Sequence, residues 1–179
     1  MSLDLKNLDE KTRRFMLEEV EHDLANDQLY ISPRLSSEGR AAYIALLKEA
    51  IESHNDAWLA QNLRYAGLMN LTEPRRKPNG GYTMVKVPVT APDTLAEGEF
   101  NRFYARGLSR RAMEEAIPAL EIYRAKEVMQ PRSESIRKIG TKVDPKALLH
   151  DLRTHPGVDT ALGLPPGPNS GLSVRLPWA

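Results

Sequence analysis

Three arginines at four-residue spacing form the most regular polar pattern in the sequence. Arg102, Arg106 and Arg110 lie in a segment with helical periodicity, so their side chains project from one side of the expected helix. Guanidinium groups on one face bind phosphate oxygens through paired hydrogen bonds, which makes this face a candidate clamp for a polyanion. The alternative is a solvated face of salt bridges at three- and four-residue spacing. Those pairs are Glu99–Arg102, Arg110–Glu114 and Arg111–Glu115.

A second basic element stands earlier in the chain. Arg75, Arg76 and Lys77 have a proline on each side and Asn-Gly-Gly shortly after them, which predicts a loop over residues 73–81. With Tyr82 close in sequence, such a loop is a candidate for contact with a nucleic-acid backbone and for stacking against a base. The alternative is three solvated cations with no ligand.

No residue receives a catalytic or metal-binding role from its type and spacing. The chain has no cysteine, which excludes thiolate metal sites and cysteine nucleophiles. No two of its four histidines are three or four residues apart, and no glycine-rich nucleotide-binding motif occurs. We therefore expect no metal and no cofactor, and the catalytic residues of any reaction stay unknown.

The net charge of +1 hides an asymmetry along the chain. Residues 1–31 carry 4 basic and 8 acidic side chains, whereas residues 72–111 carry 8 basic and 4 acidic ones. A nearly neutral total argues against a protein that coats nucleic acid non-specifically. The asymmetry is compatible with a local anion site, or with head-to-tail contact between copies of the chain.

Periodicity predicts a mainly helical α+β domain over residues 1–155, with a small, edge-rich β-sheet. Helices are expected at 7–26, 37–51, 56–63, 94–117, 133–139 and 145–152, and two strands at 82–89 and 120–125. Asn7, Ser36 or Ser37, Asn55 or Asp56, and Asp144 are the expected caps of four of these helices.

The 94–117 segment is expected to be central to this fold. Phe100, Phe103 and Tyr104 lie opposite the arginines and are predicted to face the core. Gly98 and Gly107 each cost a helix about 1 kcal/mol relative to alanine, so both predict the close approach of a backbone or a ligand.

Residues 156–179 are predicted to form an extended, proline- and glycine-rich C-terminal arm. One hypothesis is that the arm docks on a neighbouring subunit as an added strand, and the other is that it wraps its own domain. The candidate subunit contacts are Pro165, Pro166, Leu172, Val174, Leu176 and Trp178.

These features favour a non-enzymatic interaction or assembly subunit. Its partner is expected to be a second copy or another protein, with nucleic acid or another polyanion on the basic segment. The alternative is an enzyme that holds a phosphorylated or nucleic-acid substrate with its arginine clamp. The acidic N-terminal segment lacks a leader pattern and no stretch of about 18 apolar residues exists, so we expect a cytoplasmic protein without membrane contact.

Overall fold

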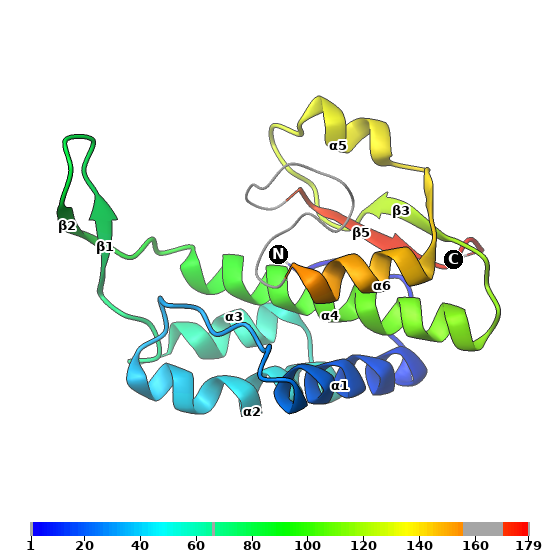
Figure 1. The fold of residues 1–179 in the computed structure, drawn as a ribbon, viewed down its shortest axis with the longest axis horizontal. Coiled ribbons are helices and arrows are strands. Elements are labelled where there is room, and N and C mark those ends of the chain that lie inside the picture. Colours follow the sequence, from blue (N-terminus) through cyan, green and yellow to red (C-terminus); the bar gives the residue numbers. More distant parts are fainter. Residues whose placement is uncertain (1, 66, 156–169, 179) are drawn as a thin grey trace.

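Helix α4 (Ala91–Glu114) is the central element of the computed structural model, which describes residues 2–65, 67–155 and 170–178 (Figure 1). It packs against α1, α3, α6 and β5. Helices α1 (Glu10–Ala25), α2 (Ser37–Ser53) and α3 (Asp56–Arg64) lie on one side of α4, and a small sheet lies on the other. The predicted mainly helical α+β class is confirmed.

Side-chain caps set where four helices begin. The side chains of Asp9, Ser36, Asn55 and Asp144 accept hydrogen bonds from backbone N–H groups three residues on, which would otherwise lack partners. Asp144 opens α6 (Pro145–Thr154), as predicted. Asn7 was the wrong cap for α1, because its side chain instead accepts a hydrogen bond from the backbone N–H of Leu176.

The strands form two separate antiparallel sheets. One sheet has the order β4-β3-β5, with β4 (Lys142–Val143), β3 (Leu120–Arg124) and β5 (Leu172–Arg175). Short helix α5 (Ser133–Lys138) joins β3 to β4. The other sheet is a hairpin of β1 (Thr72–Arg76) and β2 (Tyr82–Lys86). The prediction that the 82–89 and 120–125 strands share a sheet was therefore wrong.

The loop predicted over residues 73–81 was also wrong in its first half, which is strand β1. Gly80 and Gly81 have φ of 88° and 75°, and this left-handed backbone, which glycine adopts without strain, turns the chain back as a hairpin. The Lys77 N–H donates to the Gly81 carbonyl. Since only every second residue pair of an antiparallel ladder exchanges backbone hydrogen bonds, the odd-numbered residues of β1 make these bonds and Pro74 does not. The nitrogen of Pro74 thus points away from the ladder, and proline costs β1 no hydrogen bond.

Helix α4 is buried on two faces. Phe100, Phe103 and Tyr104 are each 0% exposed, as predicted for the core face. A Cβ on Gly107 would lie 2.7 Å from Cγ and 2.9 Å from the backbone nitrogen of Met16, so the predicted close approach is that of α1. Outside α4 itself, no atom of the described residues lies within 4 Å of the corresponding position on Gly98, so the prediction that a backbone approaches there was wrong.

No helix within the described residues combines the length and the hydrophobicity needed to cross a bilayer.

Candidate functional site

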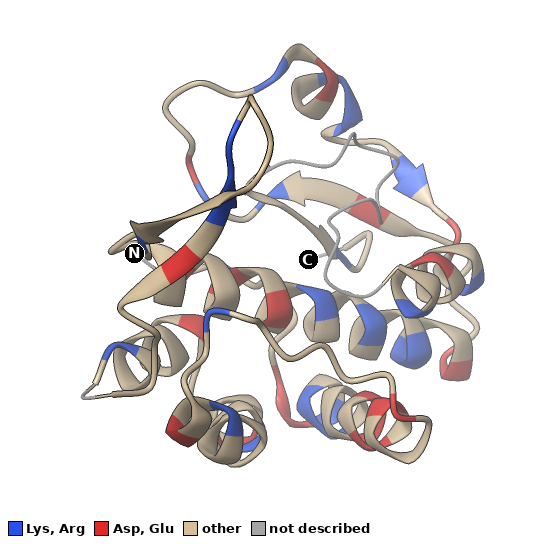
Figure 2. Ribbon diagram, turned by 60° about the vertical axis from the view of Figure 1, so that its left-hand side comes forward, with Lys and Arg blue, Asp and Glu red and all other residues tan. Residues whose placement is uncertain are grey.

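The β1–β2 hairpin stands away from the helical body and carries basic residues on and just after β1 and at the end of β2 (Figures 1 and 2). Most of its side chains are exposed, on both faces of the ribbon. A two-stranded ribbon with no core on either side gains little stability by itself. The structure thus displays a set of cationic and apolar side chains that the packing of the domain does not use.

Cross-strand register places cations and apolar side chains on the same face of the ribbon. Arg76 stands opposite Tyr82, and Pro74 stands opposite Met84. Tyr82 is 71% exposed and Met84 is 61% exposed. Lys86, at the far end of β2, shares this face because side chains alternate along a strand. An exposed aromatic ring with one cation opposite it and a second cation on the same face can stack a base while the cations contact phosphates.

No carboxylate of the described residues forms a salt bridge with a cation of the hairpin, although the charge of Arg75 helps to lower the pKa of Glu73. Glu73 is the one acidic residue between positions 72 and 86, and Arg34 of the helical body binds it through two hydrogen bonds of 2.6 and 2.8 Å. The hydrogen bond from Arg34 also lowers the pKa of Glu73. Within the described part of the chain, no salt bridge is made by four hairpin cations. They are Arg75, Arg76, Lys77 and Lys86.

The arginine face predicted on α4 is not a free polyanion-binding surface, and this expectation is corrected. Arg106 is 0% exposed, and its Nη1 and Nη2 lie 2.7 Å from the two carboxylate oxygens of Asp23. Its Nε donates to Glu19 at 2.8 Å. Arg110 forms salt bridges with Glu18 at 2.9 Å and with Glu19 at 3.2 Å. The carboxylates of α1 thus occupy the positions that a phosphate would take.

Glu19 is the centre of a buried ion cluster that joins three helices. It accepts hydrogen bonds from Arg106 and Arg110 of α4 and from Arg153 of α6, the last at 2.5 and 2.9 Å. Burial would raise the pKa of this carboxyl, but the arginines outweigh it and lower the pKa of Glu19 to about 2. The opposite charges of segments 1–31 and 72–111 therefore meet inside one chain, and head-to-tail contact between copies is not needed to explain them.

The alternative set of charge pairs on α4 is confirmed in two of its three members. Arg102 bonds Glu99 at 2.5 Å and Arg111 bonds Glu115 at 3.1 Å, whereas Arg110 turns to α1 and not to Glu114. The face is not solvated, however, because Arg102 is only 6% exposed.

Buried polar atoms at and near the Arg102–Glu99 pair lack hydrogen-bond partners among the described residues. Nε and Nη1 of Arg102, and the hydroxyl of Tyr43 on α2, are buried without an acceptor or donor from the described residues. Burial raises the pKa of Glu99 to about 7, because the charged carboxylate is desolvated more than Arg102 compensates.

The described residues of the C-terminal arm pack on their own domain. Leu172, Val174 and Leu176 are between 0% and 2% exposed, and β5 pairs with β3 at the edge of the sheet. They are therefore not available as contacts with a neighbouring subunit, which corrects that expectation. Trp178 is 69% exposed. The other two candidates, Pro165 and Pro166, lie outside the described residues.

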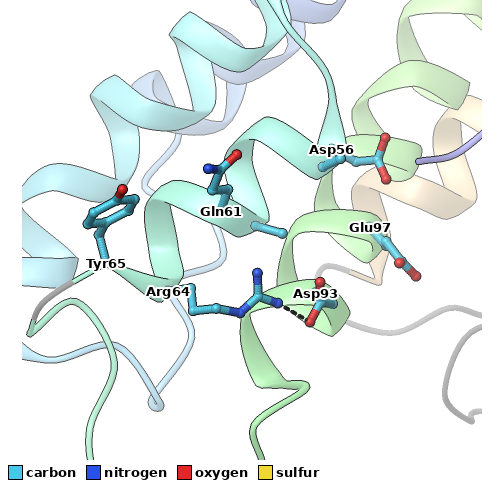
Figure 3. Close-up of a pocket in the computed structure, with 8 residues that line it drawn as sticks. Asp56, Gln61, Arg64, Tyr65, Asp93 and Glu97 are labelled. Atoms are coloured by element: carbon cyan, nitrogen blue, oxygen red, sulfur yellow. Dashed lines mark hydrogen bonds and ion pairs between the residues drawn. The ribbon is translucent and has the colours of Figure 1, made fainter. Parts of the chain in front are cut away.

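A pocket of about 640 Å³ lies between α3 and α4 (Figure 3). Its charged side chains already have partners within the chain. Arg64 bonds Asp93 at 2.5 Å, Asp56 accepts hydrogen bonds from the Ser2 hydroxyl and the Leu3 backbone, and Lys126 pairs with Glu97. No cluster of three or more potential metal ligands occurs among the described residues. This geometry assigns no acid, base or nucleophile.

Comparisons with known proteins add no family to this picture. No protein-family model matches the chain, and neither the curated proteins nor the solved structures contain a significant match. The hairpin is therefore a candidate site because of its exposed side chains, its cross-strand register and its charge.

Proposed function

We propose that this chain is a non-enzymatic binding protein that holds single-stranded nucleic acid on its β1–β2 hairpin. The observation that supports the proposal is the exposed face on which Arg76 stands opposite Tyr82, with Lys86 further along the ribbon. Cations without carboxylate partners favour phosphate contact, and an exposed aromatic ring favours stacking on an unpaired base.

The alternative function is an enzyme that holds its substrate with an arginine clamp. The central arginine of that clamp is not accessible to a substrate. Arg106 is fully buried and its guanidinium is saturated by Glu19 and Asp23. Self-assembly through the arm is likewise less well supported, because Leu172, Val174 and Leu176 are buried in their own domain. Of the candidate regions, the arginine face of α4 and segment 172–176 are largely buried, whereas the side chains of the hairpin are exposed.

Fluorescence anisotropy with labelled oligonucleotides tests the proposal. Replacing Arg75, Arg76 and Lys77 together by glutamine should weaken binding, and should reduce the salt slope by about 0.7 for each lost contact with a single strand. The matched control replaces three cations of α1 and α2, Arg14, Arg40 and Lys48, by glutamine. That variant removes the same charge from the opposite side of α4 and should leave the salt slope unchanged.

Tyr82→Ala separates stacking from charge. The loss of one base–aromatic stack should weaken single-strand binding by about 1–3 kcal/mol and should change duplex binding much less. Equal losses on both nucleic acids would show that the ring stacks on no base. Absence of binding by the parent chain at low salt would remove nucleic acid as the ligand.

A further inference from the structure

A second basic surface lies around α5, on the same side of α4 as the hairpin (Figures 1 and 2). Arg137 belongs to α5 and Lys142 to β4, and both are exposed, while Lys138 between them is half-buried. Hereafter these three residues are called the α5 patch. Helices α1, α2 and α3 lie on the opposite side of α4. The hairpin and the α5 patch therefore lie on the same side of the molecule.

The charges of the α5 patch are not neutralised within the described part of the chain. Glu134, the only acidic residue of α5, makes no salt bridge with a described cation. Glu121 stands opposite Lys142 in the strand register, but its carboxylate is bound by Arg175 at 2.6 Å. The patch therefore presents cations that no carboxylate of the described residues neutralises through a salt bridge.

The backbone holds the α5 patch in a defined position. The N–H of Gly140 donates to the Ile122 carbonyl at 2.8 Å, and the Ile122 N–H donates to the Thr141 carbonyl at 2.9 Å. Ser135 of α5 is 2% exposed, whereas Ile136 is 53% exposed on the outer side. The cations are thus fixed to the three-stranded sheet, so a ligand does not have to order a loose segment to reach them.

We infer that one nucleic-acid strand held by the hairpin also contacts the α5 patch, so that the chain binds long strands at two separated points. This inference rests on the proposed function of the hairpin. Figure 1 shows the hairpin beyond the Ala91 end of α4 and α5 over the middle of that helix, so the two regions are separated along its length. A strand too short to reach from one region to the other would gain only one contact, whereas a long strand would gain both. Two linked contacts bind more tightly than either alone because the second forms at high effective concentration.

The test compares oligonucleotides of about 6 and about 30 nucleotides, bound to the full chain at fixed salt. A variant with Arg137, Lys138 and Lys142 replaced by glutamine should bind the long strand at least about tenfold more weakly, and the short strand within about twofold of the parent. The hairpin variant at positions 75–77 should weaken both. The variant of Arg14, Arg40 and Lys48 controls for net charge, and circular dichroism confirms that each variant is folded.

The outcomes separate this inference from the proposed function. If the parent chain binds neither oligonucleotide, the hairpin proposal itself fails. If the parent binds both and the α5-patch variant binds the long strand as tightly as the parent, the second contact does not exist while the hairpin site stands. Equal weakening of short and long strands by the α5-patch variant overturns the two-point arrangement as well, because it indicates general electrostatic attraction.

Discussion

Arg106 of α4 and Asp23 of α1 form a two-pronged ion pair in which both N–O distances are 2.7 Å and both side chains are at most 2% exposed. A planar guanidinium meets a planar carboxylate in this geometry, and neither group touches solvent. Glu19 completes the set by accepting from Nε of the same arginine. This ion pair, with one member from each of the two oppositely charged segments, thus joins two helices inside the domain.

Arg106→Met should destabilise the fold by about 3–5 kcal/mol, because it leaves the buried carboxylate of Asp23 without its arginine, while Glu19 keeps Arg110 and Arg153. Urea denaturation followed by circular dichroism measures the loss. Arg14→Met is the control, since Arg14 is exposed and lies 3.9 Å from Glu18, and it should change stability by less than about 0.5 kcal/mol. A loss at Arg106 no larger than at Arg14 would show that the buried cluster adds nothing to stability.

Glu99 should make the protein less stable as the pH rises. Burial raises its pKa from 4.5 to about 7 in the folded chain, so the folded state holds a proton that the unfolded state has released. Its contribution is intact below pH 4.5, falls as the pH rises towards 7, and is constant above that. Glu99→Gln mimics the protonated form and should flatten this part of the stability profile.

Unfolding free energies of the parent and of Glu99→Gln, measured from pH 4 to pH 8, check this prediction. The difference should favour the variant increasingly towards pH 8, by an amount on the order of 3 kcal/mol at most. Parallel profiles would mean that Glu99 ionises in the folded chain as readily as in the unfolded one.

Two glycines of α4 should respond to alanine in opposite directions. A Cβ at Gly107 would meet Met16 Cγ at 2.7 Å and the Thr12 carbonyl oxygen at 3.1 Å, so Gly107→Ala should destabilise the fold by separating α1 from α4. At Gly98 no atom of the described residues outside α4 lies within 4 Å, and Gly98→Ala should stabilise by up to about 1 kcal/mol through helix propensity. Thermal unfolding of both variants tests the contrast, which disappears if α1 does not pack on Gly107.

The C-terminal strand should contribute to the stability of its own domain. Leu176→Ala removes a side chain that is 2% exposed and should cost about 2–5 kcal/mol. Trp178→Ala, at a side chain that is 69% exposed, should cost less than about 0.5 kcal/mol in the isolated chain. Denaturant midpoints measured at two protein concentrations give both values. A midpoint that rises with concentration only in the parent would instead indicate docking between subunits.

Local chemistry in the sequence was enough to predict the helices, three of the four expected caps and the mainly helical class. Ser36, Asn55 and Asp144 cap helices through bonds to groups three residues away, so no distant element is needed to recognise them. The apolar face of α4 was predictable for the same reason, because residues three and four apart on one helix always share a side.

The tertiary structure decided which polar face stays free to bind a ligand. Spacing alone placed Arg102, Arg106 and Arg110 together, but only the packing of α1 on α4 brought acidic side chains against the last two of them. Packing likewise left the hairpin cations without a salt bridge to a described residue, because Arg34 of the helical body binds the one carboxylate of the hairpin, that of Glu73. Burial and charge pairing depend on contacts between residues distant in sequence, and periodicity within one segment carries no information about those contacts.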